Sequence, residues 1–146
     1  MSNYILNQSD SFMLYPSQTM IAVLADETRV EEVAAALTIH GIEPKDIQVL
    51  HGEEGRAILD AEGSENGVLG KLLRALENVS EVQRTYVKYV DDQLAAGAYA
   101  LSVPVADEAR QKAIIEVLES AHAQFIVYFR NASIVDIQVP RDVAVL

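Results

Sequence analysis

The sequence contains an internal repeat that constrains its fold more than any other feature. The segment ADETRVEEVAAAL at residues 25–37 aligns without gaps with ADEARQKAIIEVL at residues 106–118. In both copies an aspartate follows an apolar run and precedes apolar residues at helical spacing, a pattern typical of an Asp side chain that caps a helix N-terminus. Each copy is also followed by a second short apolar run. The repeat therefore predicts two β-α-β halves within one chain.

The apolar runs that flank the two copies have the length and composition of strands. They are rich in β-branched, aromatic and other apolar residues, and turn-forming or helix-starting residues bound them. We predict strands at residues 19–25, 47–50, 98–106 and 124–129. The halves, residues 19–50 and 98–130, would form a ferredoxin-like split β-α-β fold of the α+β class. In that fold a four-stranded antiparallel sheet carries both helices on one face.

A long helical pattern separates the two halves. Apolar residues recur at alternating steps of four and three from Val68 to Tyr89, and Gly97 follows as a C-terminal stop. We therefore predict a helical insertion over residues 64–97, between the second and third strands. Either this inserted helix or a second subunit would cover the sheet face that the two repeat helices leave open.

The chain length fits a single domain, residues 19–146, preceded by an N-terminal tail or arm at residues 1–18. A chain of 146 residues can bury one core of its own. The first 18 residues are rich in Ser, Asn and Gln with isolated apolar residues, which is typical of a loose tail or of an arm that docks a few side chains. The residues after 130 alternate weakly and predict a short strand or a short helix against the core.

The composition limits the kinds of partner that the chain can have. Eleven basic and 22 acidic side chains give a net charge of −11, and a surface of this sign repels DNA and RNA. The chain has no cysteine, which excludes disulfides and thiolate metal sites. The first residues lack the pattern of a secretory signal, and no window approaches about eighteen consecutive apolar residues. We expect a cytoplasmic protein that does not bind nucleic acid or membranes.

The segment HGEEGRAILDAEGSENG, residues 51–67, combines glycines with charged residues. Backbone N–H groups at glycines, together with the start of the following helix, can bind phosphate or carboxylate, and Arg56 would add a positive charge. The candidate ligand-binding residues are His51, Gly52, Gly55, Arg56, Ser64 and Asn66. Several carboxylates in the same segment oppose an anion. The structural alternative is a polar turn in which Ser64 or Asn66 caps the long helix.

The sequence predicts no metal site and no catalytic site. Four carboxylates follow His51 in the sequence: Glu53, Glu54, Asp60 and Glu62. They do not have the spacing of an EF-hand, and no second histidine for a zinc site is nearby. His40 and His122 are expected to complement the helix dipole at the ends of the two repeat helices. No nucleophile, kinase or metalloprotease signature occurs. We expect a protein without a cofactor and without enzymatic activity.

Four segments between residues 20 and 137 can be compared with known families: HGEEGRAILDAEG, GVLGKLLRAL, GAYALSVPV and FIVYFRNASI. They resemble small bacterial proteins of the general-stress or heat-induced stress type. The resemblance implies two ferredoxin-like halves, a stress-associated or regulatory role, and no catalytic residues. An aromatic residue that often follows the last strand in that family is replaced here by Ala132.

Two classes of function follow from these patterns. The first is a non-enzymatic interaction module, which acts as a homodimer or binds a protein partner through the open sheet face or the inserted helix. The alternative is a small-molecule sensor that binds a metabolite or anion at residues 51–67 or in a cleft at a subunit interface. The alternative rests on analogy with regulatory domains of the predicted fold.

Overall fold

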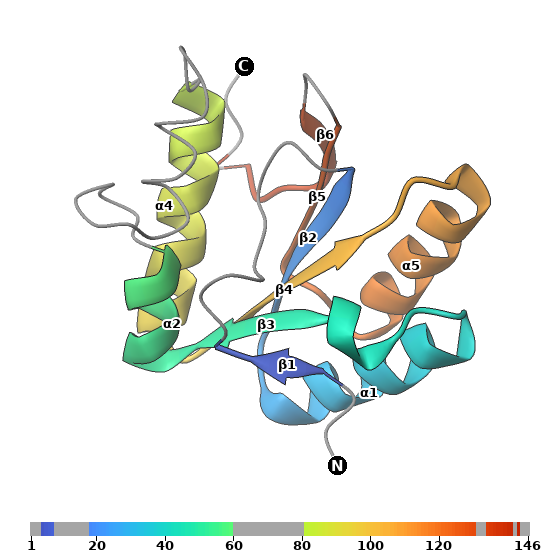
Figure 1. Cartoon of the computed structure of the whole chain (residues 1–146). Helices are drawn as coiled ribbons and strands as arrows, with labels where there is room; N and C mark the ends of the chain where they lie inside the picture. The colour runs from blue at the N-terminus through green and yellow to red at the C-terminus, as the bar shows by residue number, and fades with distance from the viewer. Residues whose placement is uncertain (1–3, 8–17, 60–80, 131–133, 142, 144–146) are drawn as a thin grey trace.

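The structure is a computed structural model that describes residues 4–7, 18–59, 81–130, 134–141 and 143. These residues form one six-stranded sheet between two layers of helices (Figure 1). The strands are β1 (Ile5–Leu6), β2 (Thr19–Leu24), β3 (Gln48–His51), β4 (Tyr99–Pro104), β5 (Phe125–Phe129) and β6 (Ile134–Gln138). The helices are α1 (Glu27–Ile39), α2 (Gly52–Leu59), α4 (Glu81–Ala95) and α5 (Glu108–Ser120), with a 3₁₀ helix η1 (Pro44–Asp46).

The prediction of a four-stranded antiparallel ferredoxin-like sheet is wrong, although the α+β class holds. The sheet has six strands in the order β1-β3-β4-β2-β5-β6, and it is mixed because β1 runs parallel to β3. The four predicted strands are present, with antiparallel pairing between β3 and β4, β4 and β2, and β2 and β5. Two further strands extend the sheet, β1 at one edge and β6 at the other.

The two additional strands have weak signals in the sequence. β1 contains only two residues within a polar segment, and its register places Ile5 opposite Gln48 and Leu6 opposite Val49. β6 alternates irregularly between half-buried and exposed positions and has no fully buried residue. Pairing with a neighbour, rather than burial, defines such strands, and the hydrophobic pattern of a single sequence carries little of that information.

The two repeat copies form equivalent helices on the same face of the sheet. Asp26 caps α1 by accepting a hydrogen bond from the backbone N–H of Arg29 at 3.0 Å, and Asp107 caps α5 by accepting from that of Arg110 at 3.2 Å. Because β2 and β4 are antiparallel and each leads into one of these helices, α1 and α5 run in opposite directions. The Arg29 guanidinium accordingly reaches the end of α5, where it donates to the Ala121 carbonyl at 3.2 Å.

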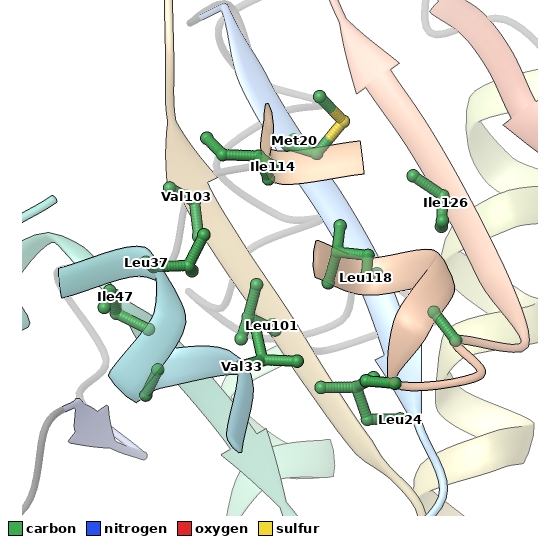
Figure 2. Close-up of a cluster of buried hydrophobic side chains, with 14 of the residues drawn as sticks. Met20, Leu24, Val33, Leu37, Ile47, Leu101, Val103, Ile114, Leu118 and Ile126 are labelled. Carbon is green, nitrogen blue, oxygen red and sulfur yellow. The ribbon is translucent and has the colours of Figure 1, made fainter. Parts of the chain in front are cut away.

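Each face of the sheet carries its own hydrophobic core. On the first face, Val33 and Leu37 of α1 and Ile114 and Leu118 of α5 pack toward the sheet around Leu101 (Figure 2). On the second face the cover consists of α2 and α4 (Figure 1). The described part of the predicted insertion, α4, is therefore one of the two helices on this face. The first part of the predicted insertion, up to residue 80, lies outside the described residues.

Three helices end in the same backbone motif. A residue with positive φ follows each helix, and the next residue donates its N–H to a carbonyl five positions earlier. The left-handed residues are Gly41 after α1, Gly97 after α4 and His122 after α5, with φ of +88°, +98° and +57°. The glycine stop at 97 agrees with the sequence prediction. His40 is the C-cap residue of α1, whereas His122 takes the place of Gly41 in the repeat.

We expect His122→Gly to stabilise the protein by about 1 kcal/mol, because glycine removes the strain of a side chain in the left-handed region. His122 is exposed, so the substitution removes little packing. Gly41→Ala at the equivalent position should destabilise the protein, since its φ is +88° and the new Cβ would lie 3.4 Å from Nη2 of Arg110. Urea denaturation measures both changes. A His122→Gly protein no more stable than the wild type would contradict this comparison of the two helix ends.

Candidate functional site

The predicted ligand segment, residues 51–67, begins as a strand end and a helix rather than as a loop. His51 is the last residue of β3, and α2 starts at the next residue. Gly52 has a φ of +68°, which lets the chain turn directly from the strand into the helix. The junction between β3 and α2 brings together four of the six predicted residues: His51, Gly52, Gly55 and Arg56. Ser64 and Asn66 lie outside the described residues.

Asn7 attaches the N-terminal segment to this junction. Its side-chain NH₂ donates to the His51 carbonyl at 3.1 Å, and its side-chain oxygen accepts from the His51 backbone N–H at 2.9 Å. A Cβ on Gly55 would lie 3.1 Å from Asn7 Oδ1 and 3.1 Å from the carbonyl carbon of Leu50. In this structure Gly55 therefore permits a close approach of the protein's own chain.

The imidazole of His51 stacks on Tyr99 of the neighbouring strand β4. The ring centroids are 3.8 Å apart and the planes differ by 5°. His51 Nδ1 lies 3.2 Å from the carbonyl oxygen of Ala98, a contact in which Nδ1 must be the donor because a carbonyl only accepts. Burial raises the pKa of Tyr99, and the carboxylates of Glu27 and Asp26 raise it further. These carboxylates make the surroundings of the stack negative, which disfavours an anionic ligand.

Arg56 of α2 forms an ion-pair network with α4. Its Nε and Nη2 donate to the two carboxylate oxygens of Asp91 at 3.0 and 3.2 Å, and its Nη1 donates to Glu53 at 3.1 Å. The side chain of Asp91 is 10% exposed and that of Arg56 is 34% exposed. The hydrogen bonds to Asp91 and Glu53 raise the pKa of Arg56. The guanidinium of Arg56, which was predicted to attract an anion, thus joins α2 to α4 on the second face.

An open groove lies between α1 and α5, and the sequence analysis did not predict it. Its volume is about 380 Å³. Buried and half-buried small or apolar side chains form the floor: Val33, Ala36, Ala113, Val117 and Ala121. Exposed polar and charged side chains stand at the margins: Glu32, His40, Glu116 and Ser120. The groove therefore offers apolar contact within a partly negative rim.

Small side chains at the facing positions of the two helices explain the groove. Ala36 of α1 and Ala113 of α5 line it, and an alanine extends only one carbon from the backbone. Close packing would require larger side chains at these positions to fill the space between the helices. In the sequence, the three consecutive alanines at residues 34–36 are the one available signal. They look like an ordinary helix interior until α5 is known to lie beside them.

The helices that bound the groove are acidic on their exposed surfaces. Together α1 and α5 contain six glutamates, all exposed, against two arginines and one lysine. Arg29 is already engaged, since its guanidinium contacts both the end of α5 and the Asp26 carboxylate at 3.8 Å. Next to the groove residue His40, Ile39 is 85% exposed. An apolar floor, an acidic rim and an exposed isoleucine nearby in sequence make this groove a candidate binding surface.

A tyrosine joins α4 to the edge strand β6 on the opposite face. The hydroxyl of Tyr86 donates to Asp136 Oδ1 at 2.8 Å. Burial, followed by this hydrogen bond, raises the pKa of Tyr86 to about 12. The neutral hydroxyl is the donor, so the link between α4 and β6 depends on its proton.

Comparison of the chain with models of protein families, with curated proteins and with solved structures gives no match. In the ranges that the structure describes, no group of three or more His, Asp or Glu side chains is arranged to hold a metal ion. No helix in those ranges is long and apolar enough to cross a bilayer. The groove and the junction between β3 and α2 are therefore interpreted from their own geometry.

We expect Asp91→Asn to lower the Tm by several degrees, because Arg56 loses the charge of a mostly buried bidentate partner. The adjacent Asp92 provides a matched control. It pairs with Lys88 at 3.0 Å, but both side chains are more than half exposed, so Asp92→Asn should scarcely change the Tm. Equal effects of the two substitutions in thermal unfolding would show that the Arg56 network does not hold α2 on α4.

The link between Tyr86 and Asp136 should make stability fall at high pH. The pKa of Tyr86 is about 12 in the folded chain and about 10 in the unfolded chain, so its stabilisation is complete below pH 10 and is lost as the pH rises toward 12. Tyr86→Phe should be less stable by about 1 kcal/mol at pH 7 and lose less stability across this range. Urea unfolding of both proteins at several pH values measures the difference. Parallel pH profiles would contradict the assignment.

Proposed function

We propose that the protein is a non-enzymatic interaction module that binds a protein partner in the groove between α1 and α5. The observation that supports this proposal is an open, apolar-floored groove on the outside of a domain whose two cores are already covered. Ile39, which precedes the groove residue His40 in the sequence, is also exposed. Grooves of this kind accept the side chains of a partner, while the polar rim fixes its orientation.

The sheet faces themselves are occupied by helices of the same chain. One face is covered by α1 and α5 and the other by α2 and α4, so a partner has no open sheet face to dock on (Figure 1). The predicted homodimer is not part of this proposal, because a second copy is not needed to complete either core. Light scattering on the full chain and on a chain lacking residues 1–18 tests the dimer and the contribution of β1 to it.

We also propose that the protein has a stress-associated or regulatory role in the cytoplasm. Its support is the resemblance of several segments, such as FIVYFRNASI, to bacterial general-stress proteins. Quantitative proteomics of the source cells before and after heat shock tests it. An unchanged amount of the protein would contradict heat induction. The interaction module would then be supported only by the groove between α1 and α5.

The sensor alternative gains no support from the contacts at the junction between β3 and α2. Arg56 is paired with two carboxylates, and His51 is stacked on Tyr99 close to the acidic start of α1. A metabolite panel in a thermal-shift assay still addresses it directly. A ligand that raises the Tm of the wild type, and not that of Arg56→Ala, would favour the sensor over the interaction module.

We expect Ala36→Trp to fill the groove and abolish partner binding without unfolding the chain, since Ala36 is half-buried at the groove floor. The matched control is Ala57→Trp, which places the same bulk at an exposed position of α2 on the other face. Proteins captured by the wild type from an extract of the source cells are identified and then tested for direct binding by calorimetry. A partner lost by Ala36→Trp and retained by Ala57→Trp is the expected result. Equal binding of the partner to the wild type, Ala36→Trp and Ala57→Trp would contradict the proposal.

A further inference from the structure

We infer that the segment bound in the groove is a basic amphipathic helix of a partner protein. This inference rests on the proposed function and adds the chemistry of the partner. It depends on three observations: the charge at the rim of the groove, the apolar floor, and the backbone of the two helices that form its walls.

The charge at the rim selects a basic partner. Glu32 stands on α1 and Glu116 on α5, so a carboxylate borders the groove from each side. Both are exposed, neither appears in an ion pair of the described residues, and four further exposed glutamates lie on the same two helices. Lysine or arginine side chains that flank an apolar stripe would place their charges opposite these carboxylates.

The same charge argues against a second copy of this chain as the occupant. A symmetric contact through this face would bring identical patches together, so each set of glutamates would face another set. The whole chain carries a net charge of −11, which adds long-range repulsion to the local one. A basic segment of a different protein is attracted both by the glutamates of the groove rim and by the net charge of the chain.

The backbone of the two helices that form the groove walls favours a helix rather than an extended peptide as the bound segment. Both walls are α-helices, whose N–H and C=O groups are already paired within each helix. An extended peptide gains affinity chiefly from hydrogen bonds to a free strand edge, and this groove has none to offer. A helix satisfies its own backbone and presents side chains at i, i+3, i+4 and i+7, which suits the strip formed by Val33, Ala36, Ala113 and Val117.

The test uses fluorescence anisotropy with a defined probe, a fluorescein-labelled peptide of leucine and lysine. Its leucines follow the i, i+3, i+4, i+7 spacing over about four helical turns. A scrambled peptide of the same composition has the same charge without the apolar stripe. Measurements at about 0.15 M salt suppress binding that depends on net charge alone. We expect the striped peptide to bind the wild type more tightly than the scrambled peptide, and Ala36→Trp to lose this preference.

Two charge-matched double variants locate the contact. Glu32→Gln with Glu116→Gln neutralises the rim and should weaken binding of the striped peptide by about tenfold. Glu31→Gln with Glu119→Gln removes the same charge from exposed positions of the same helices that do not line the groove, and it should weaken binding less than about twofold. Circular dichroism and thermal unfolding confirm that both proteins are folded.

Equal weakening by the two double variants, or equal binding of the striped and scrambled peptides, would overturn the inference, because binding would then follow the general charge of the chain. Absence of peptide binding, with natural partner binding still lost in Ala36→Trp, would also overturn it while leaving the proposed function intact. If natural partner binding is equal in the wild type, Ala36→Trp and Ala57→Trp, the proposed function fails and the inference fails with it.

Discussion

The structure depends on the burial of β2 at the centre of the sheet. This strand is paired along its length with β4 on one side and β5 on the other, and its residues are at most 1% exposed. Met20, Ala22 and Leu24 enter the core under α1 and α5, while Ile21 and Val23 enter the core under α2 and α4. A strand buried in this way requires a cover on both faces, and each buried Val, Ile, Leu or Met contributes roughly 1.5–3 kcal/mol to folding.

The helix pair on one face of the sheet, α2 and α4, is held together differently from the pair on the other face, α1 and α5. On the second face, polar side chains link neighbouring elements: Arg56 and Asp91 join α2 to α4, and Tyr86 and Asp136 join α4 to β6. On the first face, α1 and α5 meet through alanines and direct their glutamates to solvent. The proposed partner is assigned to the face that leaves a groove with charges at its rim.

A helix or strand can be predicted from the sequence when the residues that determine it lie close together in the chain. Both repeat helices, their Asp caps and the four central strands were predicted because caps, apolar runs and glycine stops act within a few residues of sequence. The strand β1 lies in the segment predicted as a tail or an arm, and β6 lies where the sequence left a short strand and a short helix open, because pairing rather than burial defines both strands. The glycines of α2 masked its helix. The partner of Arg56 is 35 residues away and the groove needs two helices side by side, so neither is a local property of the sequence.

Helices of one chain cover both faces of its sheet, and we propose the groove between α1 and α5 as the surface for a partner. Urea unfolding of the purified chain over a hundredfold range of protein concentration, about 1 to 100 μM, tests this claim most directly. A midpoint that does not change with concentration is the predicted result, because a chain with complete cores unfolds without dissociation. A midpoint that rises steadily with concentration would contradict the claim, since a second copy would then be completing the fold.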